Sequence, residues 1–108
     1  MRREEMNRTM DFLFDHRVPG LPPTALAEVF DRLIWCLADQ GEMLLNVRQS
    51  WLASDDRDRV EVALAMNETY PFTKLEEMEA TFRKIVSRWP DLEPRCAEMV
   101  QSRIKDGV

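Results

Sequence analysis

The stretch Leu26–Trp51, LAEVFDRLIWCLADQGEMLLNVRQSW, decides the fold of this chain. Its apolar residues recur at alternating spacings of four and three, and they are Leu26, Phe30, Leu33, Leu37, Leu44, Val47 and Trp51. The polar residue Gln40 interrupts the series. Because such spacing keeps one helix face turned toward a partner surface, the stretch predicts the central helix, or a pair of helices in phase, of an all-helical core.

Gly41 decides whether this stretch is one helix or two. A glycine inside a helix costs about 1 kcal/mol relative to alanine, and Asp39-Gln40-Gly41 also suits a helix end followed by a turn. The apolar phase nevertheless continues across the glycine, because Leu37 and Leu44 are one heptad apart. We therefore predict one helix over residues 24–53, capped by Thr24 and bent at Gly41, with a break at Gly41 as the alternative.

The flanking helices follow from spacing, caps and prolines. A first helix is predicted over residues 3–16, with Met6, Met10 and either Leu13 or Phe14 facing inward. It ends at the proline-rich linker 19–23, and it either packs in its own domain or swaps onto a neighbouring molecule. The cap-rich segment Ser54-Asp55-Asp56 precedes a short helix over residues 57–67, whose inward residues are predicted to be Val60, Ala63, Leu64 and Asn67.

The last forty residues predict two more helices. Thr73 and Glu76 match a capping box, which starts a helix over residues 74–89. Pro90 ends that helix, and a final helix ends before Gly107. Its inward residues are predicted to be Leu92, Cys96, Met99 and Ile104. Because the connection is tight, the two helices should form an antiparallel hairpin or a sharp corner.

Length and composition favour a single helical domain over residues 1–108. The chain has 108 residues, of which 44% are hydrophobic and 32% are charged, and only three are glycine. This predicts a bundle of four to six helices around one core. The predicted core residues are Leu26, Phe30, Leu33, Leu37, Leu44, Val47, Leu64, Phe82, Ile85 and Met99.

The charge balance favours a basic protein as partner. Fifteen Lys and Arg stand against twenty Asp and Glu, which gives a net charge of −5. This balance opposes a sequence-independent hold on nucleic acid, which depends on phosphate neutralisation by cations. We find no hydrophobic leader after Met1 and no apolar run long enough to span a membrane, so a cytoplasmic location without membrane contact is expected.

Catalytic, metal-binding and cofactor-binding motifs are not recognisable. His16 is the only histidine, so zinc sites built on histidine pairs are excluded by counting. Cys36 and Cys96 lie sixty residues apart, each in an apolar helical pattern, and are predicted to be buried, reduced thiols. The three glycines are isolated and form no phosphate-binding loop. We expect no enzyme activity, no cofactor and no metal.

Trp35 is the most informative single residue, because it falls in the polar stripe of its helix among Glu28, Asp31 and Arg32. It is either covered by the first helix or exposed as an anchor for a partner. The acidic start of the helix at residue 57 either complements the helix dipole or steers a basic partner. The predicted partner-binding residues are Trp35, Asp31, Asp55, Asp56, Asp58 and Tyr70.

These observations predict a non-catalytic, protein-binding regulator. It would be a small acidic inhibitor or adaptor that acts stoichiometrically, as immunity proteins and antitoxins do. One alternative is a DNA-binding regulator, because a turn at Gly41 would give a helix-turn-helix outline in which Arg48 is the only cation on the second helix. The other alternative is a homodimeric subunit in which the central helix pairs with its symmetry mate.

Overall fold

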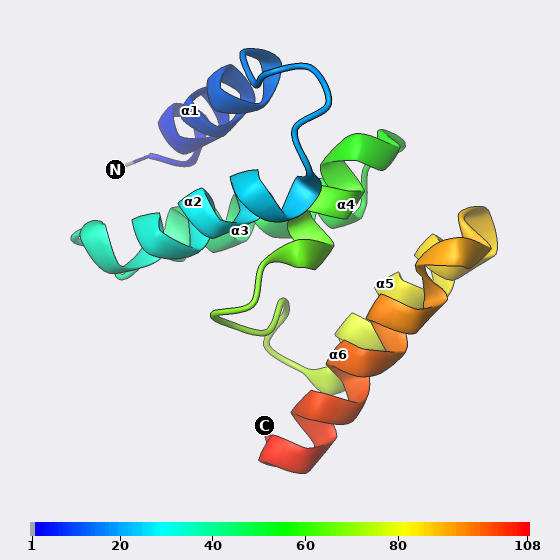
Figure 1. Cartoon of the computed structure of the whole chain (residues 1–108). Coiled ribbons are helices and arrows are strands. Elements are labelled where there is room, and N and C mark those ends of the chain that lie inside the picture. Colours follow the sequence, from blue (N-terminus) through cyan, green and yellow to red (C-terminus); the bar gives the residue numbers. More distant parts are fainter. Residues whose placement is uncertain (1) are drawn as a thin grey trace. The chain divides into compact units, whose positions relative to one another are not determined.

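A computed structural model describes residues 2–108, and every regular element in that range is helical (Figure 1). The first four helices are α1 (Arg3–Asp15), α2 (Pro23–Cys36), α3 (Glu42–Leu52) and α4 (Arg57–Ala65). They are followed by α5 (Leu75–Arg88), the short 3-10 helix η1 (Pro90–Leu92) and α6 (Glu93–Asp106). The predicted class, an all-helical bundle of four to six helices, is confirmed.

The chain divides into two compact units. The first unit ends at Thr69 and contains α1 to α4, and the second unit is Tyr70–Val108, which contains α5, η1 and α6. The prediction of a single domain over residues 1–108 stays a prediction.

The core of the first unit is built on the predicted apolar series. Its residues Leu26, Phe30, Leu44, Val47 and Trp51 are buried, and Leu33 and Leu37 are half-buried. α1 packs against α3, and α4 packs against both α2 and α3. The Trp51 ring lies edge-on to Phe14 of α1 at 5.3 Å and to Phe30 of α2 at 5.7 Å between ring centroids. Met6, Met10 and Phe14 of α1 are buried as predicted.

The prediction of one continuous helix is wrong and the alternative, a break at Gly41, is confirmed, because α2 ends at Cys36 and α3 begins at Glu42. Gln40 and Gly41 both have positive φ, at 59° and 80°, which an α-helix cannot contain. The Asp39 carboxylate accepts hydrogen bonds from the backbone N–H of Gly41 at 2.9 Å and of Met43 at 3.2 Å. A Cβ on Gly41 would lie 2.8 Å from Cγ2 of Ile34, so this turn needs glycine.

Two predicted helix caps are wrong, and one is confirmed. α2 begins at Pro23 rather than after Thr24, because proline suits the first helical position. α5 begins at Leu75, with no side-chain cap from Thr73. By contrast, the Asp56 carboxylate accepts from the backbone N–H of Asp58 and Arg59 and so caps α4. The predicted end of that helix at residue 67 is also too late, since α4 stops at Ala65 and the side chain of Asn67 is exposed.

A buried arginine holds the chain that follows α4. The Arg48 side chain is fully buried, and its guanidinium donates to the backbone carbonyls of Ala63 at 2.9 Å, Met66 at 3.0 Å and Thr69 at 2.8 Å. Asp31 of α2 holds the same segment from the other side, because its carboxylate accepts from the N–H groups of residues 67 and 68 at 2.9 and 3.4 Å. Burial raises the pKa of Asp31, although these two donors act to lower it.

In the second unit, α5 and α6 run antiparallel side by side, as the predicted hairpin requires (Figure 1). The buried residues are Met78, Phe82, Ile85, Cys96, Met99 and Arg103. The prediction that Ile104 faces inward is wrong, because its side chain is 59% exposed and the neighbouring Arg103 is buried in its place.

Arg103 holds the loop before α5 in the same way as Arg48 holds the segment after α4. Its guanidinium donates to the backbone carbonyls of Pro71, Thr73 and Val108 at 2.9, 2.9 and 3.0 Å. Phe72, between the first two acceptors, has a positive φ of 68°. The loop is therefore fixed in a non-helical conformation up to Thr73, which explains why the predicted capping box is not formed.

Candidate protein-binding surface

The solvent-facing side of α2 carries an exposed tryptophan among charged residues. We define the α2 outer face as Glu28, Val29, Arg32, Trp35 and Cys36, all of which are exposed. At 100° per residue these five positions span about 120° of the helix surface, so they form one continuous stripe. An apolar anchor with charged neighbours is the composition of a protein-binding surface, in which aromatic residues and arginine are enriched.

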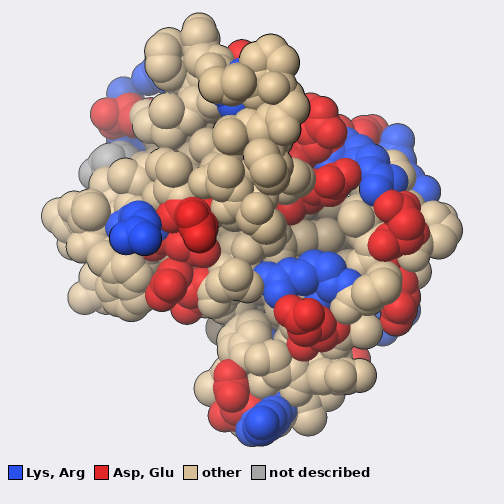
Figure 2. Space-filling model, in the orientation of Figure 1, with Lys and Arg blue, Asp and Glu red and all other residues tan. Residues whose placement is uncertain are grey.

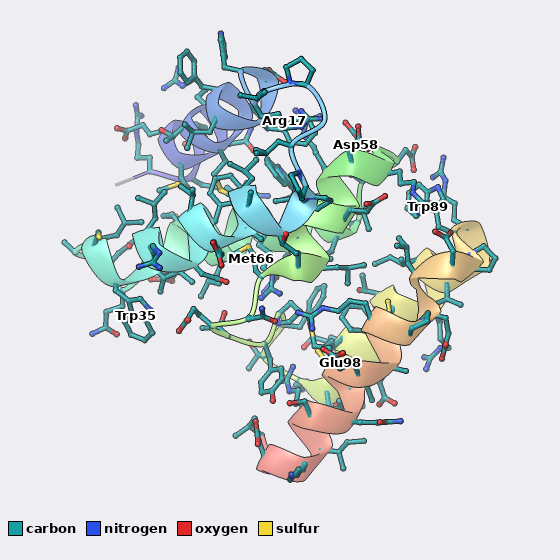
Figure 3. All side chains as sticks on the ribbon, in the orientation of Figure 1. Arg17, Trp35, Asp58, Met66, Trp89 and Glu98 are labelled. Atoms are coloured by element: carbon teal, nitrogen blue, oxygen red, sulfur yellow. The ribbon has the colours of Figure 1, made fainter. Side chains whose placement is uncertain are left out.

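Trp35 is the centre of this surface, and 71% of its side chain is exposed. The first of its two predicted interpretations, burial under the first helix, is wrong, because α1 packs against α3 instead. In Figure 3 the labelled Trp35 side chain projects away from the ribbon of α2. Asp31 lies next to this stripe, about 40° around the helix from Trp35 at 100° per residue. Its side chain is nevertheless buried, and its carboxylate is bound to backbone N–H groups.

The two cysteines lie in opposite environments. Cys36 is exposed at the end of α2, so the prediction that it is buried is wrong. Its neighbour Trp35 is exposed on the same outer face, whereas Ile34 is buried. Cys96 of the second unit is buried as predicted, and burial raises the pKa of its thiol to about 11.

Three of the predicted acidic contact residues, Asp55, Asp56 and Asp58, lie at the start of α4, at the far end of the first unit from Trp35 (Figure 3). A groove there brings Asp58 close to Pro23, which is about 18 Å along α2 from Trp35 at 1.5 Å per residue. The Asp56 carboxylate caps α4 and pairs with Arg59 at 2.7 Å, and Asp58 pairs with Arg17 at 3.3 Å. Asp55 is exposed next to them.

These ion pairs use much of the acidic segment within the unit itself. Arg59 also pairs with Asp11 of α1 at 3.2 Å, and Arg57 pairs with Glu61 at 2.7 Å. In Figure 2 acidic and basic side chains are interspersed over the visible face rather than gathered by sign. The aspartates therefore have structural roles in holding α4 and α1, as the dipole interpretation predicted for helix starts.

Tyr70 belongs to the second unit and is half-buried. Its hydroxyl is hydrogen bonded to Ser102 at 2.9 Å and donates to the Asp106 carboxylate. The bond to Asp106 raises the pKa of Tyr70, because deprotonation would place two negative charges together. Tyr70 thus ties the loop before α5 to the end of α6. Its role as a contact residue stays a prediction.

The sequence pattern missed two members of the α2 outer face, Val29 and Cys36, whereas Glu28 and Arg32 are already placed in the polar stripe with Trp35. The signal was present, because Val29 and Cys36 are seven residues apart and Arg32 lies between them at spacings of three and four. Cys36 was instead assigned to the neighbouring apolar run, which wraps around the end of the helix. Residues at a helix terminus follow the amphipathic pattern least strictly, since no further turn covers them.

The remaining candidate groups have local partners. The His16 ring stacks on Phe12 with centroids 4.1 Å apart, and its Nδ1 lies 2.8 Å from the Phe12 carbonyl oxygen. Over residues 2–108 no three His, Cys, Asp or Glu side chains are grouped as a metal site would require. Within the same range, no helix combines the length and the apolar character needed to cross a membrane.

Comparison with protein-family models, with characterised proteins and with solved structures gives no match to this chain. Its function is therefore inferred from the geometry of its own side chains.

Proposed function

We propose that this protein is a non-catalytic regulator that binds another protein through the α2 outer face, with Trp35 as the anchor. The observation that supports the proposal is the 71% exposure of Trp35 on a helix whose opposite side already fills the core. An indole of roughly 250 Å² exposed to this extent offers about 4 kcal/mol of hydrophobic stabilisation when a partner covers it. That magnitude is typical of a binding hot spot.

The partner's chemistry follows from the residues around the anchor and from the net charge. Glu28 and Arg32 flank Trp35 at spacings that place all three on one stripe, so the partner needs an apolar pocket with polar groups at its rim. The net charge of −5 favours a basic partner, whose association would be accelerated at low salt. A cytoplasmic inhibitor or adaptor that occludes a basic surface fits this description.

The two alternative functions are supported less well. The turn at Gly41 that the helix-turn-helix alternative required is present. DNA binding relied on Arg48 as the cation of α3, but Arg48 is fully buried against three backbone carbonyls. A dimer through the central helix relied on the Leu26–Trp51 apolar series, whose members fill the core of the first unit. Those side chains are engaged within one chain.

The test compares two variants that each remove one exposed aromatic side chain. The full-length protein is immobilised, and the proteins that it retains from cell extract are compared for wild type, Trp35→Ala and Phe12→Ala. Phe12 is 60% exposed on α1, so it controls for the loss of any exposed aromatic ring. We expect a specific partner to be retained by wild type and Phe12→Ala and lost with Trp35→Ala, at unchanged melting temperature.

Binding should then be measured with the purified partner, where loss of a hot spot raises the dissociation constant about thirtyfold or more. Recovery of no protein partner by the wild type would overturn the proposal. So would a Trp35→Ala variant that binds its partner as tightly as the wild type.

A further inference from the structure

The second unit contains an apolar groove that its own two helices leave open. The groove has a volume of about 610 Å³ and runs between α5 and α6. Its floor is formed by Phe82 and Val86 of α5 and by Ala97 and Val100 of α6, and its rim includes Glu79 and Arg83. A two-helix hairpin buries only one side of each helix. Further helices commonly pack into an open apolar groove of this kind.

The charges on α5 are divided between its two halves. The first half carries Glu76, Glu77 and Glu79, and the second half carries Arg83, Lys84 and Arg88. Within one helix this order complements the macrodipole. Between two copies of α5 that run antiparallel, it also places the acidic half of each against the basic half of the other. α6 is mixed in charge, since Glu93 and Arg95 lie near its start and Arg103, Lys105 and Asp106 near its end.

We propose that the groove binds the same groove of a second copy, so that two α5–α6 hairpins form an antiparallel four-helix bundle around a two-fold axis. Such an interface is self-complementary, because the axis crosses the middle of α5 and brings Glu79 of each copy opposite the Arg83-Lys84 step of the other. The apolar floors of the two grooves then face each other and form the centre of the interface. This association uses a different surface from Trp35 and is independent of the proposed function.

The size of the groove predicts a weak dimer. Two helices of 14 residues present a face about 21 Å long and 20 Å wide. The area of this face is roughly half of the ~800 Å² that each partner contributes to a stable interface. We expect a dissociation constant in the range of about 1 to 100 µM, as is common for small interfaces. The full-length protein must therefore be examined across that concentration range.

Sedimentation velocity of the full-length protein tests the proposal. Wild type should shift from monomer to dimer between about 1 and 200 µM, which spans the dissociation constants expected of small interfaces. Val86→Glu, which places a charge on the groove floor, should remain monomeric over that range. Val18→Glu is the matched control, because Val18 is an exposed valine of the first unit that lies outside the α2 outer face, and it should dimerise like wild type. Circular dichroism checks that each variant retains its helical content.

Charge reversal at the rim gives a second test that leaves the floor intact. Arg83→Glu should weaken the dimer at least tenfold, and combining it with Glu79→Arg should restore most of the affinity, since each acidic half would again face a basic one. A wild type that stays monomeric at 200 µM overturns the proposal. A dimer that persists in Val86→Glu overturns it as well, since the contact would then lie elsewhere.

Discussion

At the scale of single residues, Arg48 satisfies three carbonyl groups that have left the helical hydrogen-bonding pattern. Lysine keeps the charge but lacks the planar fork that reaches acceptors spread over residues 63–69. We predict that Arg48→Lys lowers the free energy of unfolding by about 2–4 kcal/mol, because buried acceptors lose their donors. Urea denaturation measures the loss. Arg32→Lys, on the exposed side of α2, is the control and should change stability by less than about 0.5 kcal/mol.

Asp31 predicts a pH dependence of stability whose sign is fixed by its raised pKa. The folded state binds the proton more tightly than the unfolded state, so the stability that Asp31 contributes is complete below its unfolded pKa of 3.8. It is lost as the pH rises through the folded pKa. The unfolding free energy of wild type minus that of Asp31→Asn should therefore fall as the pH rises above about 3.8. A difference that grows with pH would contradict the assignment.

The two thiols should react at very different rates. Cys36 is exposed, whereas Cys96 is buried and its pKa is raised to about 11, which leaves little thiolate at pH 8. Ellman's reagent should modify one thiol per native chain rapidly and both thiols in denaturant. Cys36→Ser should abolish the rapid phase. Retention of that phase in Cys36→Ser would show that Cys96 is accessible in the native state.

The burial of Arg48 and Arg103 was only partly readable from the sequence. Arg48 lies four residues after Leu44 and four before Leu52, and Arg103 lies four after Met99, so both stand within apolar stripes. Arginine at such a position usually lays its stem on the core and extends its charge to water. What buries these two side chains is a set of carbonyl acceptors at the end of α4 and in loops, the farthest of them 32 residues away along the chain. No local pattern reports acceptors at that separation.

At the scale of the helical elements, Gly20 and Gly41 form a natural pair of test sites. Both have φ near +80°, but a Cβ at Gly20 meets nothing within 4 Å, whereas one at Gly41 meets Ile34 Cγ2 at 2.8 Å. Alanine at either site costs about 1 kcal/mol for its left-handed conformation. Gly41→Ala should cost a further 1–3 kcal/mol or so for overpacking against α2. Equal losses of unfolding free energy in the two variants would contradict the tight α2–α3 turn.

The bounds of isolated helices were predictable, but the break inside Leu26–Trp51 was predicted only as the alternative to one continuous helix. α1 and α5 lie within a residue or two of their predicted ranges, because prolines and apolar spacing define both. Between α2 and α3 the apolar phase persists although the helix stops, since both helices bury residues in one core. The phase of the apolar residues predicts which side of a helix is buried, but it does not predict whether the backbone continues as one helix. The positive φ of Gln40, a residue without a glycine's freedom, had no signal in the sequence.

At the scale of the whole molecule, the candidate surface was predictable only through its anchor. Trp35 was recognisable because a tryptophan in a polar stripe does not face the core of its own domain. The aspartates were predicted as contact residues because they are clustered in the sequence. In the structure Asp58 pairs with Arg17 and Asp56 pairs with Arg59, so their charge is compensated within the unit. Pairing across the fold is a tertiary property. A count of acidic residues cannot separate an open acidic surface from one that is already neutralised.

The division at Thr69 predicts that the two units differ in stability when separated, because they differ in the apolar surface that each can bury alone. The first has four helices around a core that includes Phe14, Phe30 and Trp51, and it contains the Thr69 carbonyl that Arg48 binds. A fragment of residues 1–69 should therefore be helical and unfold cooperatively. The second has about 40 residues, the size below which a chain seldom buries enough surface to fold alone.

Circular dichroism of the two fragments measures this difference. The 70–108 fragment should be weakly helical when dilute, and it should gain helix with concentration if its groove finds a second copy. If instead the 1–69 fragment is unfolded, its core depends on the rest of the chain, and residues 1–108 form the single cooperative domain that the composition favours.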